Sequence, residues 1–220
     1  MQTSPIVLTT IAGLSTGLGG ALAVLCTPTE RLLAASAGFA GGVMLTASLT
    51  DLLPEALDFY AAYLPPLGSG GAAVSLLALG MLTAALLGRL LPEESELADR
   101  FGQGRDPARA AAIALHNIPE GLAVAVPFAY ATRSRAAGVL AALVSGLAEP
   151  LGAVLAWLFL RRFFTPGFLT GTVVLAAGIM VWVALAQLLP QALAAKHRAA
   201  GIFGAAAGTL LMLLGIAALP

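Results

Sequence analysis

The chain has 220 residues, of which 59% are hydrophobic and only 10% are charged, and its mean hydropathy is +0.94. Soluble domains carry about 25% charged residues, so this composition excludes a water-soluble globule and indicates a polytopic membrane protein. The equal numbers of basic and acidic residues, 11 each, argue against nucleic-acid binding, and the single Cys26 excludes an internal disulfide and a cysteine-based metal cluster.

A membrane-spanning helix needs about 20 predominantly apolar residues. Such stretches predict an all-α, polytopic transmembrane helix bundle with seven spans, in one domain of residues 1–220. The predicted spans are 5–26, 32–57, 70–91, 107–131, 136–160, 167–193 and 199–219. Short turns rich in Pro, Gly and charge separate them, and the one longer polar loop covers residues 92–106.

An internal repeat divides the predicted bundle. Residues 42–57 read GVMLTASLTDLLPEAL and residues 178–193 read GIMVWVALAQLLPQAL, which are identical at 8 of 16 positions. We therefore predict two related three-helix repeats, 5–91 and 136–219, around a central motif helix at 107–131. Repeats with a binding site at their interface are common in transporters.

The run His116-Asn117-Ile118-Pro119-Glu120-Gly121 lies inside the central span. An ionised side chain in hydrocarbon costs about 2.5–3.5 kcal/mol on insertion scales, so these residues need a polar interaction that compensates for this cost. His116 and Glu120 are four residues apart and share a helix face, with Asn117 beside them. Imidazole, amide and carboxylate groups together suit Zn²⁺ and tolerate Fe²⁺, Mn²⁺ or Cd²⁺. Pro119 removes a backbone donor and predicts a kink.

Glu149 lies in the middle of the next span and is followed by Pro150, a second predicted kink. A second carboxylate would help to neutralise a divalent ion. The alternative is a hydrogen-bonded His–Glu pair that only holds two helices together. Ser145, one turn before Glu149, is either a weak oxygen ligand or a serine bonded to its own helix.

Asp51 and Glu55 form another pair with a spacing of four residues, near the end of the second span. They are either an entry or exit station for the metal or simply carboxylates at the membrane boundary. Their repeat counterparts, Gln187 and Gln191, are uncharged, so the two ends of a pathway would be unequal.

Four segments resemble the ZIP (Zrt/Irt-like) metal transporter family, in its bacterial ZupT/GufA-like branch, and the similarity covers nearly the whole chain. They are GFAGGVMLTASLTDLLPEAL, HNIPEGLAVAVPFA, SGLAEPLGAVLAW and AAGIMVWVALAQLLPQAL. The resemblance implies eight helices, inverted repeats, a binuclear metal site between two central helices, and elevator-like or rocking alternating access. It also implies that His116, Asn117, Glu120 and Glu149 are metal ligands.

The chain departs from this family pattern in three ways. It has one motif helix where the family has two, so the fourth family helix is missing. Seven alternating crossings would make the two repeats parallel, and would place Arg31 on the opposite side of the membrane from Arg133, Arg135, Lys196 and Arg198. Gln187 stands where relatives often carry a carboxylate.

These patterns predict a secondary carrier, not an enzyme, that moves zinc or a similar cation toward the cytosol across a bacterial inner (plasma) membrane as a multi-pass protein. The expected partners are divalent cations and the lipid bilayer, with a homodimer left open. A metalloenzyme using a metal-bound water is disfavoured, because the chain has only two His residues. The remaining alternative is a non-transporting metal sensor or degenerate copy.

Overall fold

The computed structural model describes the chain except residues 1–4, 26–28, 91–106, 194–195 and 219–220. The side chains of residues 5–8, 23–24, 89–90 and 107–116 also lie outside the described part, so Cys26, the predicted polar loop and the His116 side chain do as well. The described residues form α1 (Pro5–Val24), α2 (Glu30–Ala47), η1 (Ser48–Leu52), α3 (Leu53–Ala61), α4 (Pro66–Leu90), α5 (Pro107–Thr132), α6 (Arg135–Leu160), η2 (Arg161–Phe163), α7 (Pro166–Val183), η3 (Ala184–Leu188), α8 (Leu189–Ala192) and α9 (Arg198–Ala218).

The predicted all-α membrane bundle is confirmed. Each of the seven predicted spans corresponds to helix, and the second runs without interruption through α2, η1 and α3. Among the described residues, five helical segments are long and apolar enough to cross a membrane: Glu30–Ala61, Pro66–Gly88, Arg135–Phe163, Pro166–Ala192 and Arg198–Ala218. The other two predicted spans are α1 and α5, whose side chains are only partly described.

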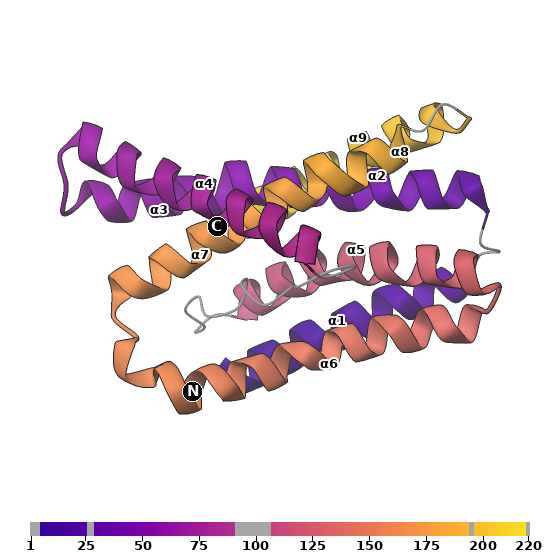
Figure 1. The fold of residues 1–220 in the computed structure, drawn as a ribbon, viewed down its shortest axis with the longest axis horizontal. Helices are drawn as coiled ribbons and strands as arrows, with labels where there is room; N and C mark the ends of the chain where they lie inside the picture. Colours follow the sequence, from indigo (N-terminus) through magenta and orange to yellow (C-terminus); the bar gives the residue numbers. More distant parts are fainter. Residues whose placement is uncertain (1–4, 26–28, 91–106, 194–195, 219–220) are drawn as a thin grey trace.

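The helices pack as two groups (Figure 1). The motif group contains α1, α5 and α6, which contact one another. The flanking group contains α2–α4 and α7–α9, in which α2 packs on α9 and α4 packs on α7. Helix α5 joins the two groups because it also contacts α2 and α9, which confirms the predicted central position of the motif helix.

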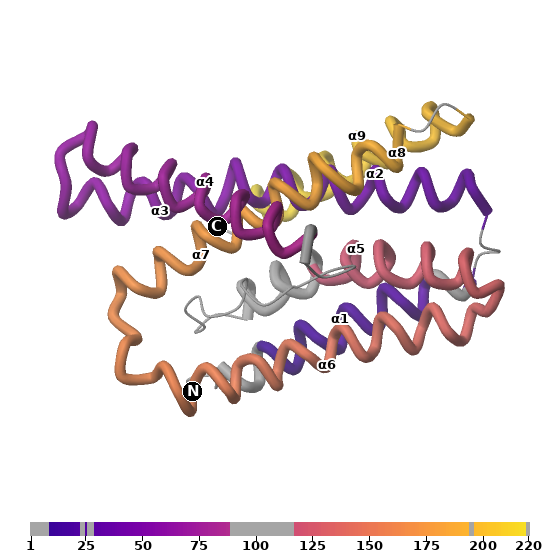
Figure 2. Tube along the Cα trace, in the orientation of Figure 1, coloured from indigo at the N-terminus to yellow at the C-terminus, as the bar shows by residue number. Residues whose placement is uncertain are grey.

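The two repeats run in opposite directions. Along α1, Gly13 faces Gly146 of α6, while Gly20, two turns later, faces Val139 and Ala142. Because the α6 numbers fall as the α1 numbers rise, the first helices of the two repeats are antiparallel. Seven strictly alternating crossings would have made the repeats parallel, so the structure excludes that arrangement and agrees with the inverted repeats that the family resemblance implies. Figure 2 shows that α4 and α5 run the same way, which inverts the second repeat.

Each repeat is completed by a helix of the other repeat. A Cβ placed on Gly38 of α2 would lie 2.1 Å from the carbonyl oxygen of Gly201 in α9. A Cβ on Gly80 of α4 would lie 2.0 Å from the carbonyl oxygen of Leu175 in α7. Backbones approach this closely only where glycine removes the side chain, as at other helix contacts in membranes.

Both repeats contain a π-helical turn at the same position. The turns η1 and η3 begin 136 positions apart, the same separation as between the two aligned repeat sequences. In each, an N–H bonds a carbonyl five residues back, from Leu53 to Ser48 and from Leu189 to Ala184. A proline follows each donor and cannot continue a regular helical ladder, so the wider turn accommodates the proline. The shared turn supports a common origin of the two repeats.

Ser48, at the start of η1, is expected to be replaceable by alanine with a gain in stability. Its hydroxyl is fully buried and has no hydrogen-bond partner among the described residues, whereas the repeat counterpart is Ala184. Because a buried unpaired hydroxyl is destabilising, Ser48→Ala should raise the free energy of unfolding by about 1 kcal/mol. Thermal unfolding in detergent measures this change. A lower midpoint would show that the hydroxyl has a partner in the membrane.

One end of the bundle is tied together by charged residues. Glu30 at the start of α2 accepts an ion pair from Lys196 at 2.6 Å and lies 3.3 Å from His197, both just before α9. Tyr130 near the end of α5 donates to the same carboxylate at 3.3 Å. The hydrogen bond to Glu30 raises the pKa of Lys196. Elements from both repeats and from the motif helix therefore meet here.

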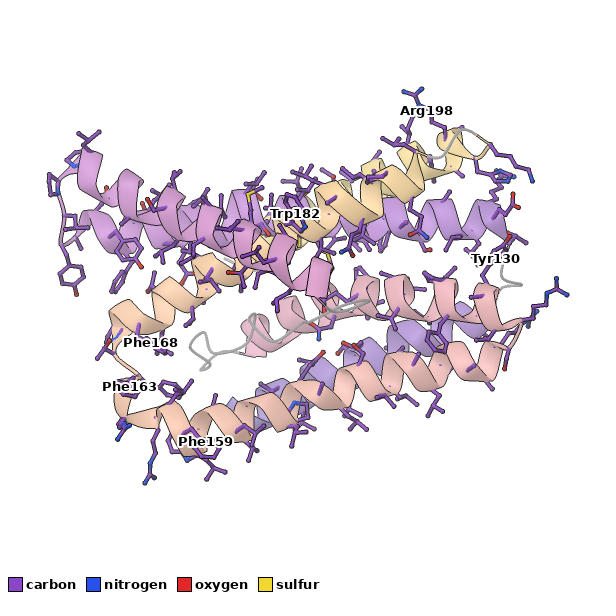
Figure 3. The ribbon with its side chains drawn as sticks, in the orientation of Figure 1. Tyr130, Phe159, Phe163, Phe168, Trp182 and Arg198 are labelled. Atoms are coloured by element: carbon purple, nitrogen blue, oxygen red, sulfur yellow. The ribbon has the colours of Figure 1, made fainter. Side chains whose placement is uncertain are left out.

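This end also collects most of the described basic residues. Arg31, Arg133, Arg135, Lys196 and Arg198 lie at its helix ends, and Figure 3 shows Tyr130 and Arg198 at this side of the molecule. Seven strictly alternating crossings would have placed Arg31 on the opposite side from the other four, and the structure excludes that arrangement as it excludes parallel repeats. Arg161 and Arg162 lie at the other end with the exposed Phe159 and Phe163. Basic and aromatic residues at such positions anchor helices at the membrane interface.

Candidate metal-binding site

Three helices of the motif group bring polar side chains together in an apolar interior. Asn117 comes from α5, Glu149 from α6 and Thr16 from α1. Their exposed fractions are 3%, 6% and 0%, so none of them faces the surroundings of the protein. Glu120, one turn after Asn117 on α5, is 5% exposed. Two carboxyl groups are thus buried in a bundle where burial of charge is costly.

Hydrogen bonds join the three helices at this point. The Asn117 amide donates to Glu149 Oε1 at 3.1 Å and to Oε2 at 3.3 Å. The Thr16 hydroxyl donates to Glu149 Oε1 at 2.8 Å, and it accepts from the Asn117 amide at 3.0 Å. Asn117 and Glu149, which the sequence selected independently, are therefore direct neighbours.

Glycines bring the three backbones close enough for these contacts. A Cβ on Gly146 of α6 would lie 2.3 Å from the Gly13 carbonyl oxygen of α1. A Cβ on Gly121 of α5 would lie 1.9 Å from the carbonyl oxygen of Thr16. Each glycine lies within one turn of a polar residue of the site. The glycines that let the backbones pack closely therefore also bring the polar side chains of the site together.

Glu120 lies toward the boundary between the two helix groups. With 3.6 residues per turn, it falls midway around α5 between Asn117 and Ala123. Asn117 contacts α1 and α6, whereas Ala123 packs in a core cluster with Met44 of α2 and Met180 of α7. The two sides of α5 therefore face different helix groups, and Glu120 lies between them.

His116 precedes Asn117 in α5, and its side chain is outside the described part of the chain. Among the described side chains, no three His, Cys, Asp or Glu residues gather closely enough to hold a metal ion. The described groups of the site that could offer an oxygen atom to a metal ion are the carboxylate of Glu149, the amide of Asn117 and the hydroxyl of Thr16. Together with the carboxylate of Glu120, they supply oxygen ligands of the kind that coordinate divalent cations.

The sequence of this chain matches a known transporter family. The description of the family is "ZIP Zinc transporter", and its profile matches residues 108–219, which include Asn117, Glu120 and Glu149. The zinc transporter ZupT of Chlorobium luteolum is 34% identical, and the alignment covers 96% of each chain. The zinc transporter ZupT of Corynebacterium glutamicum is 36% identical over 95% of this chain and 96% of the relative. The chain belongs to the ZIP family.

This ZIP protein is a multi-pass membrane protein of the bacterial type, and it belongs to a family of transporters, not enzymes. The Chlorobium alignment extends over 257 residues, whereas this chain has 220, so the relative has segments that are opposite gaps here.

The predicted accessory residues lie elsewhere in this ZIP chain. Asp51 is partly exposed in η1, Glu55 is exposed in α3 and Gln187 is exposed in η3, and all three belong to the flanking group. Ser145, one turn before Glu149 on α6, is partly buried. Their roles stay predictions, as do the kinks at Pro119 and Pro150, which lie inside α5 and α6.

Thr16 is a site residue that the sequence analysis missed. An isolated threonine in an apolar helix has no distinctive signature, because its hydroxyl can bond the carbonyl four residues earlier. The available signal was its spacing on α1: Gly13, Thr16 and Gly20 follow one another at three and four residues and so share a face. A polar residue between closely packing glycines marks the side that contacts other helices.

Proposed function

We propose that this ZIP protein transports divalent metal ions across a bacterial inner membrane, with zinc as the substrate and with net movement toward the cytosol. The observation that carries the proposal is the buried pair of Asn117 and Glu149, held together at 3.1 Å inside an apolar bundle. The names of the relatives, zinc transporters of several bacteria, support zinc as the ion.

The proposed ligands are His116, Asn117, Glu120 and Glu149. Glu120 and Glu149 would balance the two positive charges of the ion, and the imidazole of His116 would add the nitrogen donor that zinc favours. The amide oxygen of Asn117 would complete a mixed set that also accepts Fe²⁺, Mn²⁺ and Cd²⁺. Because carboxylates and imidazole bind metal only when deprotonated, low pH should weaken the binding.

The position of Glu120 supports alternating access. An ion at this residue would lie where the motif group meets the flanking group, because Glu120 lies between the two contacting sides of α5. A shift of the motif group relative to the flanking group would change the side of the membrane from which the ion is accessible. The inverted repeats support this mechanism, because inverted repeats supply two related conformations in many transporters.

The distribution of basic residues supports an orientation. Five of the seven described Lys and Arg residues lie at the end that contains the Glu30–Lys196 ion pair. Cytoplasmic loops of membrane proteins carry an excess of Lys and Arg, so we assign this end to the cytosol. The described start of α1 then lies toward the opposite side of the membrane (Figure 1).

Reconstituted protein tests the function. Liposomes that contain the protein and an enclosed zinc-sensitive dye should report zinc entry, whereas protein-free liposomes should not. Glu120→Gln should abolish most of the flux while leaving a folded protein. Stoichiometric zinc binding without any flux would overturn transport and would favour a metal sensor or a degenerate copy. Equal flux in the wild type and in Glu120→Gln would remove Glu120 from the site.

A further inference from the structure

The Thr16 hydroxyl occupies a central place in the hydrogen bonding of the site. It links α1 to two of the four predicted ligands, since it donates to Glu149 at 2.8 Å and accepts from Asn117 at 3.0 Å. Thr16 itself is fully buried. Helix α1 contains no His, Asp or Glu, so it contributes to the site through this hydroxyl and not through a charge.

The backbone around Thr16 holds the hydroxyl in place. The Thr16 carbonyl approaches Gly121 of α5, and Gly13, one turn earlier, approaches Gly146 of α6. These two contacts lie on either side of the hydroxyl and leave α1 little freedom to move away from α5 or α6. The packing therefore holds the backbone of Thr16 beside α5 and α6, within reach of Glu149.

The hydroxyl has a second acceptor within its own helix. Thr16 Oγ1 lies 3.4 Å from the carbonyl oxygen of Ala12, against 2.8 Å from Glu149 Oε1. A hydroxyl has one hydrogen, so it serves one of these acceptors at a time. If a cation takes over Glu149 Oε1, the hydrogen can turn to the Ala12 carbonyl, a common bond for threonine in helices. The carboxylate can then be released without leaving the Thr16 hydroxyl unpaired.

We propose that Thr16 is a positioning residue for Glu149, which orients the carboxylate before the metal ion binds and releases it when the ion arrives. This inference rests on the proposed function, because it concerns the same metal site. Groups that orient metal ligands typically contribute 10–100-fold to metal affinity. Loss of the hydroxyl should therefore act on the apparent affinity for the ion more than on the maximal rate.

Zinc uptake by reconstituted Thr16→Val and Thr16→Ser tests the proposal. Thr16→Val keeps the shape without the hydroxyl, and its KM for zinc should rise about tenfold, with a smaller change in maximal rate. Thr16→Ser keeps the hydroxyl and should stay within about twofold of the wild type. Thr16→Ala removes the hydroxyl without adding bulk, and it replaces the valine variant if that variant does not fold.

The matched control is Thr46→Val. Thr46 is also buried, but its hydroxyl bonds the Gly42 carbonyl at 2.8 Å within its own helix, α2. This variant should keep the wild-type KM. An unchanged KM in both Thr16→Val and Thr16→Ala, alongside a loss of uptake in Glu149→Gln, would overturn the role of Thr16. Absence of uptake in the wild type would instead overturn the proposed function.

Discussion

Replacing Glu149 with glutamine should lower zinc uptake by about a hundredfold or more. The amide has nearly the shape of the carboxylate and can still accept from Thr16, so the fold should persist. The negative charge is lost, however, and a divalent ion would face a single carboxylate in a water-poor interior. Removing one partner of a buried charge pair costs about 3–5 kcal/mol, which corresponds to roughly 10²–10⁴ in affinity.

The measurement is the initial rate of zinc entry into liposomes at several zinc concentrations, together with the thermal midpoint of the purified variant. Asp58→Asn is the control, because it removes a carboxylate from an exposed position on α3. It should keep the wild-type rate. A Glu149→Gln rate within threefold of the wild type, in a folded protein, would exclude Glu149 as a metal ligand.

Replacing Gly121 with alanine should prevent stable packing of α5 on α1. The added Cβ would lie 1.9 Å from the Thr16 carbonyl oxygen, 2.8 Å from its carbon and 3.0 Å from the Gly20 nitrogen. All three are backbone atoms, so no side chain can rotate away and the helices themselves must separate. Overpacking costs about 1–3 kcal/mol where side chains can adjust, so we expect at least this loss here.

Thermal unfolding in detergent measures the effect, and zinc uptake should fall with it because separating α5 from α1 parts Asn117 from Thr16. Gly71→Ala on α4 is the control, since a Cβ there meets nothing within 4 Å. Alanine favours helix over glycine by about 1 kcal/mol at most, so this variant should be as stable as the wild type or slightly more stable. Similar midpoints for the two variants would contradict the close approach at Gly121.

Much of the fold follows from local sequence. Apolar length identified the helices, and the shared Leu-Leu-Pro at the same distance from Gly-x-Met identified the repeats, which also share a π-helical turn. Helix direction could not be predicted in the same way. A count of alternating crossings makes α5 reverse the direction of α4, whereas the described parts of these two helices run the same way.

The candidate site was predicted in part. Asn117, Glu120 and Glu149 stood out because polar groups are costly in apolar helices, and the structure buries all three. The partnership of Thr16 with Glu149 spans 133 positions and arises only when α1 crosses α6. No local pattern encodes such a contact, because a hydroxyl in an isolated helix is already satisfied by its own backbone.

The exchange of partners between the repeats has a consequence for biogenesis. Because α2 packs on α9 and α4 packs on α7, the helices of the first repeat lack some of their neighbours until the second repeat has been synthesised. Their glycine-lined surfaces therefore contact lipid until the helices of the second repeat insert in the opposite direction. Assembly is then a late interlocking of two halves, so a failure to insert either half leaves both unfinished.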